Sequence, residues 1–179
     1  MDRQPVHIFP APTNGPAAKI LVSGCLNGPP IRYNQTNVAV ESPVWDRWAA
    51  EGRLVPFCAE LAAGMLIPRR PAEILGGDGT NVRSGTGTVV EDTGADITDQ
   101  FVEGAQLAVA EAVRRGCVAA VLTDGSPSCG STYIYDGSFS CATKAGTGVV
   151  AQMLIDNGIR VFSETELDVA DEFIQHLES

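Results

Sequence analysis

The stretch Thr98–Leu122 (TDQFVEGAQLAVAEAVRRGCVAAVL) contains a helix, a stop and an apolar strand in immediate succession. We expect the helix to run from about Thr98 to Arg115 and to end at Gly116, because the position after a helix favours a left-handed backbone. The run Cys117–Leu122 shows little alternation of apolar and polar residues, which is typical of a strand covered on both faces.

The same order of elements recurs on both sides of this stretch. Ser42-Pro43 is typical of a helix start, and Ser163–Glu166 has the pattern of a capping box. The expected helices span residues 42–51, 98–115, 147–157 and 163–179, and strands follow the first three at 53–57, 117–122 and 159–162. These repeats predict a single α/β domain over residues 18–179, with an open, mostly parallel, Rossmann-like sheet and helices on both faces.

Two segments depart from this repeat. Residues 68–97 are rich in turn formers and β-branched residues, and they predict an inserted loop and β-hairpin. Their cluster Gly76-Gly77-Asp78-Gly79 matches neither phosphate-loop pattern, and because we expect no helix directly after it, we interpret it as turn chemistry. Residues 1–17 contain four prolines and no periodicity, which predicts a mobile tail or a packing arm.

Bulk composition narrows the class of protein. The chain has 179 residues, of which 44% are hydrophobic, and its mean hydropathy is +0.05. There is no apolar run of the ~20 residues that a membrane helix needs, and no secretory signal pattern. The odd count of five cysteines argues against a disulfide framework and favours a reducing, cytoplasmic location. A net charge of -10 argues against a broad nucleic-acid surface and leaves a small substrate open.

Three cysteines follow predicted strands. Cys25 comes directly after Ile20-Leu21-Val22-Ser23-Gly24, Cys58 after the strand that ends at Phe57, and Cys129 after the strand that ends at Leu122 and a short loop. The carboxyl ends of parallel strands meet at the ligand-binding edge of an open α/β sheet. The sequence therefore predicts that the three thiols lie along one edge.

The segments around these cysteines add polar groups. The loop Ser126-Pro127-Ser128-Cys129-Gly130-Ser131 offers three hydroxyls beside its thiol, and Asn27 follows Cys25 closely, so Asn27, Ser128 and Ser131 are candidate substrate-binding residues. Glu60 lies two residues after Cys58, where a carboxylate could move protons beside a metal. Each feature also has a plainer interpretation, namely a structural turn, a helix N-terminal charge or a core thiol.

Three thiols without histidine favour one class of metal centre. The histidines, His7 and His176, lie far from these loops in the sequence. Thiolate ligands suit iron–sulfur clusters, and a cluster held by three cysteines leaves one iron open. We interpret Cys117 as a packed core thiol and Cys141 as a spare thiol, with capture of sulfur as the alternative role for Cys141.

The chain resembles the thiouracil desulfidase-like proteins from about Lys19 to Glu166. The anchoring segments are ILVSGCLNG (20–28), Arg32-Tyr33, VPFCAE (55–60), PRRPAEI (68–74), GGDG (76–79), SPSCG (126–130) and IYDGSF (134–139). The chain has Ala59 where the family commonly has Pro, Thr123 and Gly125 where it has a Lys and a larger polar residue, and Cys141 where it has Gly.

The resemblance implies a 4Fe-4S cluster held by Cys25, Cys58 and Cys129, and removal of sulfur from thiolated pyrimidines to give the oxo base and sulfide. It implies Glu60 and Ser126 as the proton-handling pair. Some relatives act on thiouridine in transfer RNA and carry an additional domain. We expect no such domain in this acidic chain, so a small thiolated pyrimidine, a base or nucleoside, is the expected partner. Two other hypotheses remain: a non-catalytic iron–sulfur or thiol sensor, and a metal-free cysteine enzyme with Cys129 as nucleophile.

Overall fold

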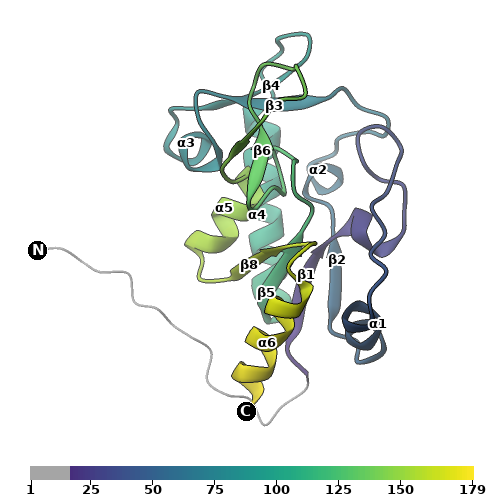
Figure 1. Ribbon diagram of the computed structural model, residues 1–179. Helices are drawn as coiled ribbons and strands as arrows, with labels where there is room; N and C mark the ends of the chain where they lie inside the picture. The colour runs from purple at the N-terminus through teal and green to yellow at the C-terminus, as the bar shows by residue number, and fades with distance from the viewer. Residues whose placement is uncertain (1–16) are drawn as a thin grey trace, which may run out of the picture.

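A four-stranded parallel sheet forms the centre of the computed structural model, which describes residues 17–179 (Figure 1). The strand order is β2 (Leu54–Phe57), β1 (Lys19–Ser23), β5 (Cys117–Leu122) and β8 (Arg160–Ser163). All three strand pairs are parallel, which confirms the predicted sheet. The predicted tail lies, apart from Ala17, outside the described residues.

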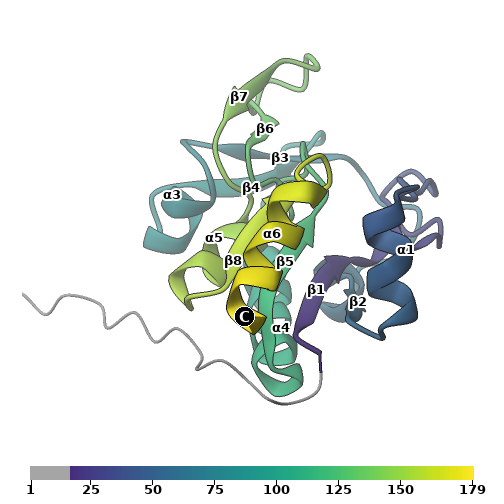
Figure 2. The same ribbon diagram turned by 60° about the horizontal axis from the view of Figure 1, so that its bottom comes forward.

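Helices cover both faces of this sheet (Figure 2). On one face pack α4 (Thr98–Arg115), α5 (Val149–Asp156) and the short α2 (Ala59–Ala62); on the other pack α1 (Pro43–Ala50) and α6 (Leu167–Glu178). Successive residues of β1 serve the two layers, because Leu21 packs in the first cluster while Ile20 and Val22 pack in the second. Both faces are buried, so the strands lack alternation.

Most helix boundaries follow the predicted signals. Ser42 accepts the backbone N–H of Val44 at the start of α1, and Gly116 ends α4 with φ 67°. The predicted start of the last helix is wrong: Glu166 accepts the N–H of Ser163 at 2.8 Å, and α6 begins only at Leu167. The capping pattern instead closes a turn between β8 and α6.

The insertion contains the expected hairpin and an additional helix. Strands β3 (Ala72–Leu75) and β4 (Thr88–Glu91) pair antiparallel, and α3 (Gly79–Ser84) lies between them. Our expectation that no helix follows the glycine cluster is therefore wrong, because Asp78 and Asn81 form a capping box that starts α3. The helix is only six residues long, so its apolar pattern is too short to stand out.

A second small hairpin was not predicted. Strands β6 (Tyr133–Tyr135) and β7 (Thr143–Ala145) pair antiparallel. Figure 1 shows both hairpins beyond the carboxyl end of the central sheet. The short 3₁₀ helix η1 (Gly24–Asn27) follows β1 at the same end. Among the described residues, no helix has the length and apolar character needed to cross a membrane.

Gly104 allows α4 to approach α2 closely. A Cβ atom at this position would lie 2.6 Å from the backbone oxygen of Ala59. Gly104→Ala is therefore expected to lower the free energy of unfolding by about 1–3 kcal/mol through overpacking, as measured by urea denaturation. At an unconstrained helix position the same change would raise stability by about 1 kcal/mol, so a gain would contradict the close approach. Gln106→Ala, at an exposed position of α4, is the matched control.

Candidate active site

The three predicted cysteines line one cavity of about 610 Å³. Cys25 lies in η1 after β1, Cys58 occupies the position before α2, and Cys129 lies in the loop after β5. The strand order places β1 and β5 side by side where the connections turn in opposite directions. Such a switch point is where open α/β sheets bind ligands. The prediction that these thiols meet at one sheet edge is confirmed.

Hydrogen bonds at the strand ends hold two of the thiol-bearing segments. The Sγ atom of Cys25 lies 3.1 Å from Oγ1 of Thr123, and Thr123 donates its N–H to Ser23 Oγ at 3.1 Å. The Oγ atom of Ser126 accepts the N–H of Cys129 at 3.2 Å. The ends of β1 and β5 are therefore tied together directly below the cavity.

Burial raises the pKa of all three thiols. The rise is strongest for Cys129, where desolvation is the main cause; a hydrogen bond from Ser23 opposes it, and the nearby Cys25 and Glu60 add to it. These thiols hold their protons at neutral pH in this environment. A metal centre that binds them must therefore displace protons.

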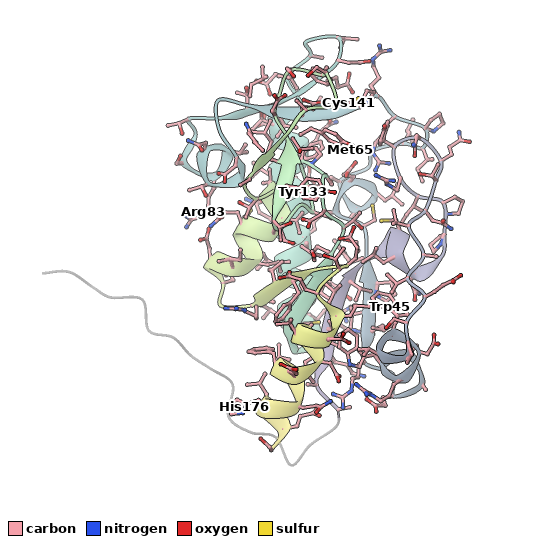
Figure 3. All side chains as sticks on the ribbon, in the orientation of Figure 1. Trp45, Met65, Arg83, Tyr133, Cys141 and His176 are labelled. Carbon is pink, nitrogen blue, oxygen red and sulfur yellow. The ribbon has the colours of Figure 1, made fainter. Side chains whose placement is uncertain are left out.

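The donor set fits an iron–sulfur cluster better than a single ion. Within residues 17–179, no group of three or more His, Cys, Asp or Glu side chains is gathered closely enough to hold one metal ion. The three thiols line one cavity, and sulfur donors are the ligands that iron–sulfur clusters use. Figure 3 shows His176 on α6, well away from Met65 and Cys141 at the cavity.

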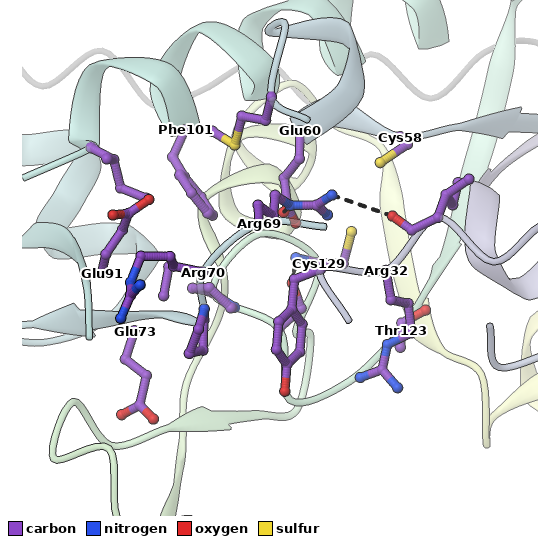
Figure 4. Close-up of a pocket in the computed structure, with 18 of the residues that line it drawn as sticks. Arg32, Cys58, Glu60, Arg69, Arg70, Glu73, Glu91, Phe101, Thr123 and Cys129 are labelled. Atoms are coloured by element: carbon purple, nitrogen blue, oxygen red, sulfur yellow. Dashed lines mark hydrogen bonds and ion pairs between the residues drawn. The ribbon is translucent and has the colours of Figure 1, made fainter. Parts of the chain in front are cut away.

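Glu60 reaches the cavity from the first turn of α2. Its Oε2 atom accepts a hydrogen bond from Nε of Arg69. The two side chains lie next to each other in Figure 4 and are only 16% and 12% exposed. Its Oε1 atom has no hydrogen-bond partner within residues 17–179. Because no fully buried side-chain oxygen of the described residues lacks a partner, Oε1 is accessible. Glu60 therefore has one bound and one available oxygen.

Ser126 lines the same cavity, so the structure brings together the two residues predicted to handle protons. Its Oγ atom accepts the N–H groups of Ser128 at 3.1 Å and Cys129 at 3.2 Å. A hydroxyl has two acceptor positions and one donor hydrogen. Since both acceptor positions are used, the Ser126 hydroxyl can act toward the cavity as a donor.

The candidate substrate-binding residues Asn27, Ser128 and Ser131 do not line the cavity. Ser128 is buried, and its carbonyl accepts the N–H of Val150 at 2.9 Å. Ser131 donates its N–H and its hydroxyl to Asp124 Oδ1 at 2.7 and 3.3 Å, while Asn27 is exposed at the end of η1. None of these three residues is therefore part of the cavity wall, and Ser131 stabilises its own loop instead.

Aromatic and cationic side chains that the sequence reasoning did not assign line the rest of the cavity. They include Arg32, Tyr33, Phe57, Arg69, Arg70, Phe101, Tyr135 and Phe139. Some of these lie in segments that carry the family resemblance. The Arg69-Arg70 pair between two prolines is the sequence feature that could have indicated them as site residues. A mostly apolar wall with a few polar groups is typical of a small-molecule site.

The loop between β6 and β7 forms part of this wall. Glu73 is buried, and its Oε2 atom accepts the N–H groups of Gly137 at 2.8 Å and Phe139 at 3.1 Å. The same loop places Cys141, with φ 64°, on the cavity lining. Cys117 instead is buried at the start of β5, where burial raises its pKa to about 11, and its predicted role as a packed thiol is confirmed.

Comparisons with known proteins agree on one group. Residues 20–166 match the model of the family described as 2-thiouracil desulfurase. The chain is 43% identical over 149 residues to the uncharacterised protein YbbK of Bacillus subtilis (strain 168), which covers 83% of this chain and 97% of YbbK. The solved structure of TudS, a [4Fe-4S]-dependent thiouracil desulfidase, superposes with a TM-score of 0.78 and 40% identity, covering 87% of this chain and 99% of TudS.

Proposed function

We propose that this chain, which belongs to the 2-thiouracil desulfurase family, removes sulfur from thiouracil-type pyrimidines to give the oxo base and sulfide. It is an iron–sulfur-dependent desulfidase, like the TudS structure that it matches over most of its length. The observation that carries the proposal is the shared cavity, which gathers Cys25, Cys58, Cys129, Glu60 and Ser126 from three separate segments.

Cys25, Cys58 and Cys129 are the proposed ligands of a 4Fe-4S cluster. Their thiols line one space, and thiolates are the usual ligands of such clusters. When bound by three residues, the cluster supplies an iron with an open position, a Lewis acid for a thiocarbonyl sulfur. Loading requires the loss of the thiol protons that burial retains.

The reaction proposed for the protein residues is a hydrolysis. Water and the thiocarbonyl give a carbonyl and hydrogen sulfide, with no net transfer of electrons. The Oε1 atom of Glu60 accepts a proton from the attacking water, and the Ser126 hydroxyl, whose acceptor positions are occupied, donates a hydrogen bond to the pyrimidine. The aromatic wall holds the ring and keeps bulk water out.

The hypothesis of a metal-free cysteine enzyme conflicts with the direction of the pKa shift of Cys129, its nucleophile. A reactive cysteine needs a lowered pKa, whereas burial raises the pKa of Cys129 strongly. A non-catalytic sensor would not need a substrate cavity, and this hypothesis does not explain the cavity of about 610 Å³. We therefore favour a small thiolated pyrimidine as the ligand of the cavity. The reducing cytoplasm stays a prediction for where the protein acts.

Metal analysis and turnover of anaerobically purified protein test the proposal together. We expect about four irons and four acid-labile sulfides per chain, and equal amounts of uracil and sulfide from 2-thiouracil or 4-thiouracil. In H₂¹⁸O, the uracil should acquire one heavy oxygen if the reaction is a hydrolysis. A loaded cluster without turnover would favour the sensor, and turnover without iron would favour the cysteine enzyme.

A further inference from the structure

Arg69 connects three segments at the edge of the cavity. Its Nε atom donates to Glu60 Oε2, and its Nη1 atom lies 3.4 Å from the carbonyl oxygens of both Ile31 and Leu66. The side chain is only 12% exposed, and it lines the cavity. One guanidinium therefore joins α2, the turn after α2 and the loop that follows Cys25.

The neighbouring Arg70 also lines the cavity, but its partner and its exposure are different. Arg70 binds Asp92 at 2.6 Å, and its side chain is 56% exposed. A surface ion pair of that kind contributes little to a fold. The Glu60–Arg69 pair is enclosed instead, and removal of one partner from an enclosed pair leaves the other without compensation.

A glutamate has three rotatable bonds, so an unrestrained carboxylate adopts several positions. The planar guanidinium donates in fixed directions, so the one carboxylate oxygen that accepts from its Nε is restrained. Arg69 uses Oε2 and is itself fixed by two backbone carbonyls, while Oε1 stays without a partner among residues 17–179. The arrangement leaves Oε1 as the Glu60 oxygen without a hydrogen bond, on a residue that lines the cavity.

We propose that Arg69 is a positioning residue that holds the Glu60 carboxylate by Oε2 and thereby presents Oε1 to the reacting water. The proposal rests on the proposed desulfidase function and on the role of Glu60 in it. Arg69 acts through Glu60 and has no separate part in the reaction.

A double-mutant cycle between Arg69 and Glu60 tests this relation. Arg69→Met is expected to lower kcat for 2-thiouracil on the order of 10- to 100-fold, since small misplacements of a reacting group have effects of this size, with KM changed by less than about threefold. Arg69→Lys should recover part of the loss, because it keeps the charge without the fork. In the Glu60→Gln background, Arg69→Met should cause no further loss.

Iron content and the visible spectrum should match wild type in every variant. Arg83→Met is the matched control, because Arg83 on α3 pairs with Asp156 on α5 and lies away from the cavity (Figure 3). Additive losses in the cycle, or an unchanged kcat in Arg69→Met, would overturn the proposal. If Arg69→Met does not fold, an Arg69→Lys variant with wild-type kcat would overturn it equally.

Crystal structures separate this proposal from the function on which it rests. We expect Glu60 in one conformation in wild type, and in several or in a displaced position in the Arg69 variants. If wild type turns over no thiouracil, the desulfidase function fails, while displacement of Glu60 still supports its positioning by Arg69. A Glu60 carboxylate that stays in place without Arg69 would overturn the positioning proposal whether or not the enzyme is active.

Discussion

Cys129→Ser protein is expected to contain less than about one iron per chain and to show no thiouracil turnover above background, because a hydroxyl is a poor ligand for the soft iron sites of a cluster. Cys129 follows β5 at the switch point and lies near both Cys25 and Cys58. Loss of its sulfur removes one of three proposed ligands, and within residues 17–179 the sole histidine, His176, lies far from the cavity (Figure 3). Iron, sulfide and the visible spectrum after anaerobic reconstitution measure the effect.

Two other cysteines provide controls for this variant. Cys117→Ala changes a buried thiol at the opposite end of β5, and Cys141→Ser changes a thiol that lines the cavity from the β6–β7 loop. Both should keep about four irons per chain. Circular dichroism should show that Cys129→Ser remains folded. A folded Cys129→Ser protein with a full cluster would contradict the ligand assignment.

The sheet and its thiol edge could be predicted because the responsible signals are local. Gly116 ends α4 and β5 begins at the next residue, as the sequence indicates. Once the strands are parallel, their carboxyl ends must meet at one edge. Cys25, Cys58 and Cys129 therefore come together although Cys129 lies far from the other two in the sequence. The direction of the strands is enough to predict this edge, and side-chain packing need not be known.

The rest of the site depends on tertiary contacts that no local pattern reports. Arg69 and Glu73 belong to the insertion, and their partners Glu60 and Gly137 are fixed only when this segment lies over the sheet. The β6 and β7 strands are three residues each, too short for a periodic signal. Polarity also misleads in the cysteine loop, where the hydrogen bonds of Ser131 stabilise the loop itself.

Glu60→Gln is expected to lower kcat for thiouracil by roughly 10²- to 10⁴-fold, the usual range for loss of a general base, while iron content stays at the wild-type level. Glutamine has the shape of glutamate, and its amide oxygen can still accept from Arg69, so the position of the side chain is retained. What the variant loses is the ability to take a proton at Oε1, the oxygen that has no partner among the described residues. Anaerobic turnover at saturating substrate measures this loss apart from binding.

The matched control for Glu60→Gln is Glu111→Gln, which removes another arginine-binding carboxylate, here paired with Arg114 on α4 outside the cavity. Its kcat should equal that of wild type. A Glu60→Gln enzyme with kcat within twofold of wild type would show that water loses its proton elsewhere. Loss of iron in Glu60→Gln would instead mean that the carboxylate supports the cluster, so metal content must be measured on the same sample as turnover. Only a slow variant with a full cluster places Glu60 at the proton-transfer step.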